Sequence, residues 1–508
     1  MEQITIYNGQ RVKTLSYQEP VLLADLLTAQ QLLLAMPCAG HHTCGKCKVQ
    51  AYGALSPLSA DEKRLLTIEE QLSNLRLACC TTILGGCTIR LEQPKTAPVQ
   101  TGGFSINSGA GRSLFGTDGY VLAADIGTTT VAAYLLNLRG GEPVTASGLN
   151  AQAPYGADVI SRIERCTQFG VKPLQQAILT QLDRLFQQLL IQEHLSPLAI
   201  NGVVLAGNTV MLHLLDGLDP SGLAMAPYTP QSLFGVLCSA RGLLQSLAPA
   251  TEIYLAPCIS AFVGGDITCA LVACGLQPGD LLLDVGTNGE MALMTEEELL
   301  CCATAAGPAF EGANLQFGMV AADGAIERVC IQNQQPVCRV IGGKNAVGIC
   351  GTGAISALAA LLKAGLVDET GLLAEPYADG FPLSGQVLLT QADIRQLQLA
   401  KAAIAAGIDT LLHAGKLDLT QLRTVYLAGG FGSYIEPADA CRIGLFPAEL
   451  VDKIRPVGNA AGAGACLCAR AEAAIEQAQQ LAQRAVSLDL ANSAYFNEQY
   501  IERMLFPM

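Results

Sequence analysis

The sequence predicts a multidomain protein of mixed α/β and α+β class, with a small unit at the front and a larger, internally duplicated α/β unit behind it. Three observations lead to this prediction. The chain has 508 residues, too many for one ordinary hydrophobic core. Half of the residues are apolar and 52 are Gly, a composition typical of Gly-rich α/β proteins and not of disordered chains. Two strand-and-turn motifs recur in the same order, which indicates a duplication.

Charge and hydropathy argue against two classes of partner. The formal net charge is −14 and no basic run offsets it, so nucleic acid is not an expected partner. Apolar runs end before the ~18 to 20 residues needed to span a bilayer, so no membrane association is expected. Residues 1–5 lack the basic end and apolar stretch of a signal peptide, which favours a cytoplasmic location.

Residues 1–92 are expected to form a compact half-barrel. Strands are predicted at 4–7 and 12–15 around Asn8-Gly9, a dipeptide typical of hairpin turns because both positions need positive φ. Apolar residues at helical spacing predict a helix over 21–31. The other expected elements are a strand at 47–52, a short helix at 59–66 and a closing strand at 87–91.

The cysteine spacing in this unit predicts an iron–sulfur cluster. The chain has 19 Cys and no export signal, which favours thiols and metal ligands over disulfides. Cys38, Cys44 and Cys47 are spaced C-x5-C-x2-C, and Cys79 follows 32 positions later. A [2Fe–2S] cluster needs four thiolates, and the plant-type pattern C-x4-C-x2-C…C is one loop residue shorter.

This unit resembles the 2Fe-2S ferredoxins of the adrenodoxin-like branch, which have the longer loop. Residues 76–79 (RLAC) are similar to that family's fourth-ligand context, and this resemblance alone favours Cys79 over Cys80. It implies a β-grasp-like fold. A structural zinc site is the alternative, although zinc ligands usually come as two short-spaced pairs. His41 and His42 suggest a Rieske variant, in which histidines would replace two cysteines.

The chain behind this unit divides into a linker and two related halves. Residues 93–118 have the Pro, Gly and Ser content of a flexible linker. Residues 121–129 (VLAADIGTT) are echoed by 281–288 (LLLDVGTN), and 203–208 (VVLAGN) by 425–430 (VYLAGG). The predicted halves are therefore 119–278 and 279–508. Asp125 and Gly207 are 82 positions apart, whereas Asp284 and Gly429 are 145 apart, so the second half has room for a small inserted subdomain.

The two Asp-x-Gly-Thr motifs have the chemistry of phosphate loops. Asp125 and Asp284 follow apolar strands, where the chain must turn sharply. Gly lets a phosphate approach the backbone, hydroxyls and N–H groups can cradle it, and Asp can hold Mg²⁺ through water. Capping of the next helix is the alternative role for each Asp. The candidate nucleotide-binding residues are Gly127, Thr128, Thr129, Thr130, Gly207, Asn208, Gly286, Thr287, Asn288, Gly429, Gly430 and Gly432.

These loops resemble the phosphate-1 and phosphate-2 loops of the actin, sugar-kinase and heat-shock chaperone ATPase superfamily. Residues 427–433 look like its adenosine loop, and 348–355 are similar to its connecting segment. The resemblance implies a duplicated actin-like (ribonuclease H-like) ATPase fold that binds ATP and Mg²⁺, with Asp125 and Asp284 as catalytic residues. Neither a Rossmann nor a P-loop signature is present in the sequence.

A ferredoxin joined to such an ATPase resembles the ATP-dependent reductive activators of corrinoid proteins. Residues 155–163 and 307–312 also look like segments of that family. The resemblance implies one-electron transfer from the 2Fe-2S cluster to Co(II) cobalamin on a corrinoid protein of a methyltransferase system, which regenerates Co(I). An upstream electron donor is also implied. Plant-type clusters lie near about −400 mV, the family's cobalt couple lies lower, and each 100 mV costs about 2.3 kcal/mol.

Other roles and arrangements stay open. The protein could drive another low-potential enzyme, as activators of 2-hydroxyacyl-CoA dehydratases do, or be a redox-sensing nucleotide-binding protein; a sugar-kinase activity has no diagnostic signature here. Larger family members carry an extra domain for which the linker leaves no room, so docking or homodimer formation could differ. The helix-rich segment 458–490 could pack on the ATPase or on a second subunit. Asp158 and Glu311 have functional and structural alternatives.

Overall fold

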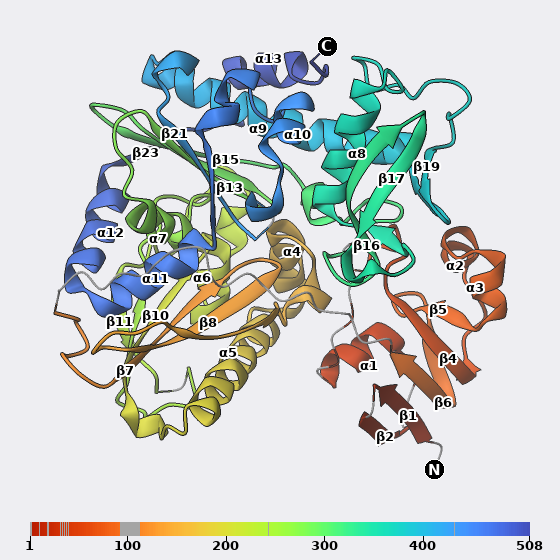
Figure 1. Cartoon of the computed structure of the whole chain (residues 1–508). Helices are drawn as coiled ribbons and strands as arrows, with labels where there is room; N and C mark the ends of the chain where they lie inside the picture. Colours follow the sequence, from red (N-terminus) through yellow and green to blue (C-terminus); the bar gives the residue numbers. More distant parts are fainter. Residues whose placement is uncertain are drawn as a thin grey trace. The chain divides into compact units, whose positions relative to one another are not determined.

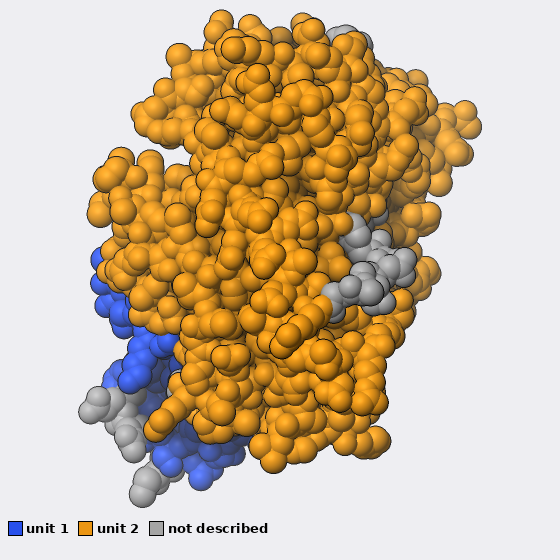
Figure 2. All heavy atoms as spheres, turned by 90° about the vertical axis from the view of Figure 1, so that its left-hand side faces the viewer, with its two compact units in different colours: residues 1–95, 149–178 blue, residues 96–148, 179–508 orange. Residues whose placement is uncertain are grey.

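The computed structural model describes residues 3–9, 11–17, 20–30, 32, 34, 36, 38, 40–91, 112–241, 243–430 and 432–507. The chain divides into an N-terminal unit of residues 1–95 and 149–178 and a larger unit of residues 96–148 and 179–508 (Figure 2). Most of the predicted linker lies outside the described residues, as do Gln31 of the predicted helix and Phe431 of the predicted adenosine loop. No helix in the described ranges is both long and apolar enough to cross a membrane.

The N-terminal unit is built on a six-stranded sheet with the path β2-β1-β6-β4-β5, and β3 pairs with β6 (Figure 1). Apolar residues of α1 and the central strands, among them Leu23, Val49 and Ile89, form its core. Its elements are β1 (Gln3–Asn8), β2 (Arg11–Ser16), β3 (Val21–Leu22), α1 (Leu23–Ala29), β4 (Lys48–Leu55), α2 (Ala60–Leu65), α3 (Ile68–Leu72), β5 (Leu75–Leu77), β6 (Thr82–Leu91), η1 (Ala153–Tyr155) and α4 (Val159–Phe169). α5 (Lys172–Gln192) begins in this unit and continues into the larger one.

The predicted hairpin and the helix over 59–66 are confirmed. β1 and β2 pair antiparallel with Asn8 opposite Arg11, so the turn begins one residue later than predicted: Gly9 has a positive φ of 60°, whereas Asn8 is the last residue of β1. Ser59 caps α2 by accepting a hydrogen bond from the Glu62 N–H. The helix predicted over 21–31 is shorter, because Val21 and Leu22 form β3 and pair with β6. The strands predicted at 47–52 and 87–91 are longer, and α3 and β5 were not predicted.

The larger unit contains two six-stranded sheets with matching strand orders. The first sheet runs β11-β12-β10-β7-β8-β9 and the second β22-β21-β13-β14-β15-β23 (Figure 1). The strands that carry Asp125 and Asp284 are β7 and β13. In the first sheet β7 pairs antiparallel with β8 and parallel with β10. In the second sheet β13 pairs in the same way with β14 and β21. Asp125 lies opposite Ala206, and Asp284 lies opposite Ala428. The predicted duplication is therefore present in the topology.

The first sheet's strands are β7 (Tyr120–Ile126), β8 (Thr130–Asn137), β9 (Val144–Leu149), β10 (Ile200–Gly207), β11 (Val236–Ser239) and β12 (Glu252–Leu255). Those of the second sheet are β13 (Asp280–Val285), β14 (Gly289–Met294), β15 (Leu299–Thr304), β21 (Thr424–Ala428), β22 (Ile454–Gly458) and β23 (Ala485–Ser487). The helices around them include α6 (Thr209–Asp216), α7 (Gly265–Cys274), α10 (Pro437–Arg442), α11 (Ala460–Arg470), α12 (Glu472–Arg484) and α13 (Ala494–Glu502).

Two helices connect the sheets. α7 follows β12 of the first sheet and packs on both sheets, and α11 follows β22 of the second sheet and packs on β7, β8 and α7 (Figure 1). The two helices approach closely because Gly464 has no side chain: a Cβ there would lie 1.8 Å from the Cys269 carbonyl oxygen. Part of the segment 458–490 thus belongs to the core of this unit.

The second half carries the predicted insertion between β15 and β21. It contains η4 (Pro308–Glu311), a three-stranded sheet of β16 (Ala325–Gln332), β17 (Gln335–Val340) and β18 (Gly348–Ile349), helix α8 (Gly351–Lys363), the pair β19 (Phe381–Ser384) and β20 (Val387–Leu389), and the long helix α9 (Gln391–Gly415). In the N-terminal unit, Asp158 caps α4 by accepting a hydrogen bond from the Ser161 N–H at 2.8 Å. This bond supports the structural alternative for Asp158.

Candidate functional site

The four predicted cluster cysteines form two close pairs in the N-terminal unit. Cys38 Sγ lies 3.3 Å from Cys44 Sγ, and Cys47 Sγ lies 3.3 Å from Cys79 Sγ. All four are free thiols. Among the described side chains, the one group of three metal-ligating atoms within 4.8 Å of one another is His42, Cys79 and Cys80, so no three of the four cysteines meet at one point.

This pairing bears on the kind of metal site. A tetrahedral zinc ion holds its sulfur ligands at about 2.3 Å, which requires all four sulfurs to lie about 3.8 Å apart. The four sulfurs instead form two separate pairs, Cys38 with Cys44 and Cys47 with Cys79, and each pair can supply two ligands. Such a set suits a cluster with two metal centres, each held by one pair.

Backbone N–H groups favour the thiolate form that a metal ligand needs. Although burial alone would raise the pKa of Cys38, hydrogen bonds from the backbone of Thr43 and Cys44 lower it to about 6. The hydrogen bond between Cys47 and Cys79 lowers the pKa of Cys47 and raises that of Cys79, because the two sulfurs share one proton. Burial raises the pKa of Cys44, so the thiolate form is favoured at Cys38 and Cys47.

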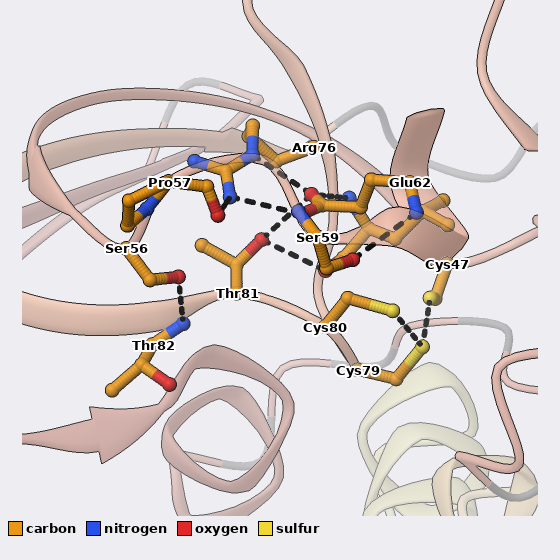
Figure 3. Close-up of polar contacts among 11 residues, drawn as sticks. Cys47, Ser56, Pro57, Ser59, Glu62, Arg76, Cys79, Cys80, Thr81 and Thr82 are labelled. Atoms are coloured by element: carbon orange, nitrogen blue, oxygen red, sulfur yellow. Dashed lines mark hydrogen bonds and ion pairs between the residues drawn. The ribbon is translucent and has the colours of Figure 1, made fainter. Parts of the chain in front are cut away.

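A buried ion pair holds the segment that carries Cys79 (Figure 3). Glu62 of α2 is fully buried and pairs with Arg76 of β5 at 2.8 Å. The same carboxylate accepts hydrogen bonds from the N–H of Leu77 at 3.1 Å and from the hydroxyl of Thr81 at 3.1 Å. Glu62 thus holds Arg76, Leu77 and Thr81 together around the turn that carries Cys79, which gives Arg76 of the RLAC segment a structural role beside the predicted ligand.

Cys80 and the two histidines lie close to these thiols. Cys80 Sγ is 3.6 Å from Cys79 Sγ. His42 Nε2 lies 2.9 Å from the carbonyl oxygen of Cys79 and its Nδ1 lies 3.3 Å from Asp61, while His41 lies 3.5 Å from Glu164. The described group of ligating atoms contains one histidine, His42, whereas a Rieske centre needs two on one iron, which argues against the Rieske alternative.

The second site is a group of carboxylates between the two sheets of the larger unit. We call it the acidic site: Asp125 at the end of β7, Asp266 in the first turn of α7, Asp284 at the end of β13, Glu290 on β14 and Glu311 in η4. Their charges act on one another, since Asp125 and Asp284 raise the pKa of Asp266, and Glu311 raises that of Asp284.

Glu311 joins the two predicted phosphate loops. The hydroxyl of Thr129 donates to both carboxylate oxygens of Glu311 at 3.1 Å, and the hydroxyl of Thr287 donates to Oε2 at 2.9 Å. Thr129 belongs to the phosphate loop that begins at Asp125, and Thr287 belongs to the one that begins at Asp284. Of the two alternatives left open for Glu311, this position supports the functional one.

Burial and mutual repulsion make the acidic site hard to ionise. Burial raises the pKa of Asp125 to about 6, partly opposed by Asn459, and burial together with Asp125 and Glu311 raises the pKa of Asp284 to about 7. The pKa values of Asp266 and Glu290 are also raised, first by burial and then by neighbouring carboxylates. Charges of one sign so close together favour bound protons or a bound cation.

Two asparagines donate to these carboxylates. Asn459 Nδ2 lies 2.9 Å from Asp125 Oδ2, and Asn208 Nδ2 lies 3.2 Å from Glu290 Oε1. Asn208 was a predicted site residue, whereas Asp266, Glu290 and Asn459 were not. The available signals were weak: a Gly-Gly-Asp triplet before an apolar helix, a Glu six positions after Asp284, and an Asn before an Ala-rich helix.

The predicted glycines have two kinds of position. A Cβ on Gly429 would lie 2.7 Å from Asp284 Oδ1, one on Gly207 would lie 2.9 Å from the Ile126 carbonyl, and one on Gly127 would lie 2.8 Å from the Thr130 carbonyl. A Cβ on Gly430 would meet nothing within 4 Å, which leaves room for a ligand to approach the backbone, and one on Gly286 would be in ordinary contact with the Asn288 carbonyl oxygen at 3.8 Å and with Glu311 Oε1 at 4.0 Å. Of the remaining predicted residues, Thr128 and Asn288 lie in the turns after β7 and β13, Thr130 begins β8, and Gly432 begins η7 (Gly432–Tyr434).

Comparison with known proteins extends this description. A family model described as "RACo middle region" matches residues 120–278, and one described as "C-terminal domain of RACo the ASKHA domain" matches residues 279–508. The "Corrinoid activation enzyme RamQ" of Eubacterium limosum is 32% identical over 421 residues, which cover 76% of this chain and 70% of that protein. A Methanosarcina barkeri protein named "[Co(II) methylated amine-specific corrinoid protein] reductase" is 27% identical over 421 residues, 75% of this chain and 76% of the other.

Two further similarities concern the fold. A solved structure named "Reductive activator for corrinoid,iron-sulfur protein" is 28% identical and superposes with a TM-score of 0.69, covering 100% of this chain and 98% of that one. A Trichomonas vaginalis ferredoxin is 35% identical over 83 residues, 16% of this chain and 81% of the ferredoxin. The predicted fold class, a ferredoxin-like unit joined to a duplicated actin-like ATPase fold, is confirmed.

Proposed function

Because the chain belongs to the reductive activators of corrinoid proteins, we propose that it uses ATP to deliver one electron to the Co(II) cobalamin of a corrinoid protein and thereby regenerates Co(I) for methyl transfer. The observation that carries the proposal is the presence in one chain of paired cluster thiols and of an acidic site joined to two phosphate loops. The corrinoid protein, part of a methyltransferase system, is the substrate.

The electron carrier is a 2Fe-2S cluster held by Cys38, Cys44, Cys47 and Cys79. Their arrangement as two pairs supports a centre with two iron ions. When bound, such a cluster supplies a one-electron couple of low potential, near about −400 mV in plant-type proteins. A separate upstream donor would supply the electron.

ATP and Mg²⁺ bind at the acidic site. Asp125 and Asp284 would hold Mg²⁺ through water, and the backbone of residues 127–130 and 286–288 would cradle the phosphates. The open space at Gly430 and the raised pKa values of the buried carboxylates support this assignment. Glu311 orients Thr129 and Thr287 toward one point, so both halves contribute to one phosphate site.

Nucleotide must favour one of two conformations of the protein if it is to support electron transfer to an acceptor of lower reduction potential. Binding energy can shift such an equilibrium only through contacts that differ between the two states. The acidic site offers these contacts because its carboxylates come from both sheets. With each 100 mV of deficit costing about 2.3 kcal/mol, a difference of a few kcal/mol is sufficient.

The test is an anaerobic assay with purified protein, a chemical reductant and a Co(II) corrinoid protein. With Mg-ATP present, the absorption band of Co(I) should grow, and it should stay absent without nucleotide or with the Cys38→Ser variant. ATP turnover without any nucleotide-dependent Co(I) would support a redox-sensing protein instead. If Mg-ATP supported reduction of a different low-potential acceptor but no reduction of the corrinoid protein, the protein would be an activator of another enzyme.

A further inference from the structure

Two asparagines lie where the halves of the larger unit meet. We infer that Asn208 and Asn459 are positioning residues, each of which holds a carboxylate of the acidic site that comes from the other half. Asn208 belongs to the first half and contacts Glu290 of the second, whereas Asn459 belongs to the second half and contacts Asp125 of the first. The inference rests on the proposed role of the acidic site in binding Mg-nucleotide.

Asn208 is held rigidly at the end of β10. Its Oδ1 accepts a hydrogen bond from the Val210 N–H at 3.0 Å and so caps α6. Its Nδ2 donates to Glu290 Oε1 at 3.2 Å, and the two residues are only 5% and 7% exposed. The backbone is packed tightly here, since a Cβ on Gly264 would lie 2.6 Å from the Cα of Asn208.

Asn459 is held in the same way at the end of β22. Its Oδ1 accepts a hydrogen bond from the Gly462 N–H at 2.7 Å and caps α11, and its Nδ2 donates to Asp125 Oδ2 at 2.9 Å. The helix it caps is pressed onto the first sheet, because a Cβ on Gly462 would lie 2.3 Å from the Tyr134 hydroxyl oxygen. The amide therefore has little freedom to move away from Asp125.

The capping bond determines what each amide presents to the carboxylate. Because the oxygen accepts from a backbone N–H, the amide nitrogen must face the acidic site, and it can only donate. A donated hydrogen bond stabilises an ionised carboxylate, the form that a divalent cation requires. Both hydrogen bonds, Asn208 to Glu290 and Asn459 to Asp125, join one half of the larger unit to the other. A shift between the halves therefore displaces a carboxylate and changes the affinity for Mg-nucleotide.

Asn→Asp and Asn→Ala variants separate this role from capping. Asp caps a helix as well as Asn does, but it turns a carboxylate toward Glu290 or Asp125 in place of an amide donor. Ala removes both the cap and the donor. Positioning therefore predicts that Asn208→Asp and Asn459→Asp harm nucleotide binding more than the Ala variants do, whereas a capping role predicts the reverse order.

The measurement is Mg-ADP binding to the anaerobic full-length protein by calorimetry at several Mg²⁺ concentrations. We expect each Asp variant to bind Mg-ADP at least about tenfold more weakly than wild type and to need more Mg²⁺ for half-saturation, because it loses a hydrogen bond to a charged group, as the Ala variant does, and also adds a like charge beside the carboxylate. An Asp variant that binds as tightly as wild type, or no more weakly than its Ala counterpart, overturns the assignment for that residue.

A donor–acceptor exchange gives a second measurement at Asn208. In the Asn208→Asp/Glu290→Gln double variant the hydrogen bond can form with its polarity reversed, so Mg-ADP affinity should recover relative to Asn208→Asp alone; no recovery overturns the assignment. Because binding is measured without corrinoid protein, failure of this inference is distinct from failure of the proposed function. The latter would appear as wild-type protein that binds Mg-nucleotide normally and yields no Co(I).

Discussion

Replacing Glu62 by Gln should cost the N-terminal unit much of its stability and its hold on the cluster. The Glu62 carboxylate is fully buried and accepts hydrogen bonds from Arg76, Leu77, Thr81 and Ser59, at 2.8 to 3.1 Å. These contacts outweigh burial and keep the pKa of Glu62 below its usual value. In Glu62→Gln an NH₂ group must face several donors, and the Arg76 charge loses its counter-ion.

The expected magnitude follows from the burial of both partners. The side chains of Glu62 and Arg76 are 0% and 9% exposed, and removing one partner of a buried pair costs about 3 to 5 kcal/mol. Domain stabilities are typically about 5 to 15 kcal/mol. The variant should therefore lose a large fraction of the free energy of unfolding of this unit. Because the lost contacts hold the turn that carries Cys79, the cluster should dissociate at lower denaturant.

Glu70→Gln is a matched control in the same unit. Glu70 also occupies the third position of a capped helix and pairs with a cation, Lys48, but these side chains are 24% and 36% exposed. Such a pair contributes about 0 to 1 kcal/mol. Anaerobic urea unfolding, followed by the visible absorbance of the cluster, compares the two variants. If the free energies of unfolding of Glu62→Gln and Glu70→Gln differed by less than about 1 kcal/mol, which is the scale of an exposed ion pair, the reasoning from burial would be wrong.

Three further predictions concern the thiols and the acidic site. Cys79→Ser should lose the cluster, seen as lost iron and visible absorbance, whereas Cys80→Ser should keep it; the opposite pattern would make Cys80 the fourth ligand. Glu311→Gln should slow ATP hydrolysis at least about tenfold, because bonds to Thr129 and Thr287 lose a charged acceptor, and unchanged phosphate release would contradict the role assigned to Glu311. The pKa values of Asp125 and Asp284 are raised from 3.8 to about 6 and about 7, so the folded protein binds these protons more tightly than the unfolded chain. Their contribution to stability is complete below pH ~4 and is lost as pH rises through about 6 to 7. The melting temperature measured without Mg²⁺ or nucleotide should therefore fall as pH rises from about 4 to about 7. The fall should be smaller in the Asp284→Asn variant than in wild type. An equal fall in the two proteins would exclude deprotonation of Asp284 as its cause.

The sequence determined those features that depend on neighbouring residues. Three of the proposed ligands lie on one loop, so Cys38, Cys44 and Cys47 could be recognised by spacing. Asp125 and Asp284 were recognisable because an apolar strand followed by a glycine turn is a local pattern. Two copies of that pattern predicted the duplication, and the matching sheets carry it. The hairpin around Asn8-Gly9 and the short helix over 59–66 were predicted for the same reason.

Only the tertiary structure decided which distant groups meet. The pairing of Cys38 with Cys44 and of Cys47 with Cys79 depends on how β5 returns beside β4, and it favours two metal centres over one. Asp266, Glu290 and Asn459 reach the acidic site from two helices and a strand that carry no phosphate-loop pattern. Their proximity depends on the packing of α7 and α11 between two sheets. Backbone preferences act over a few residues, whereas burial, like-charge repulsion and hydrogen bonds across the halves exist only once those elements have packed.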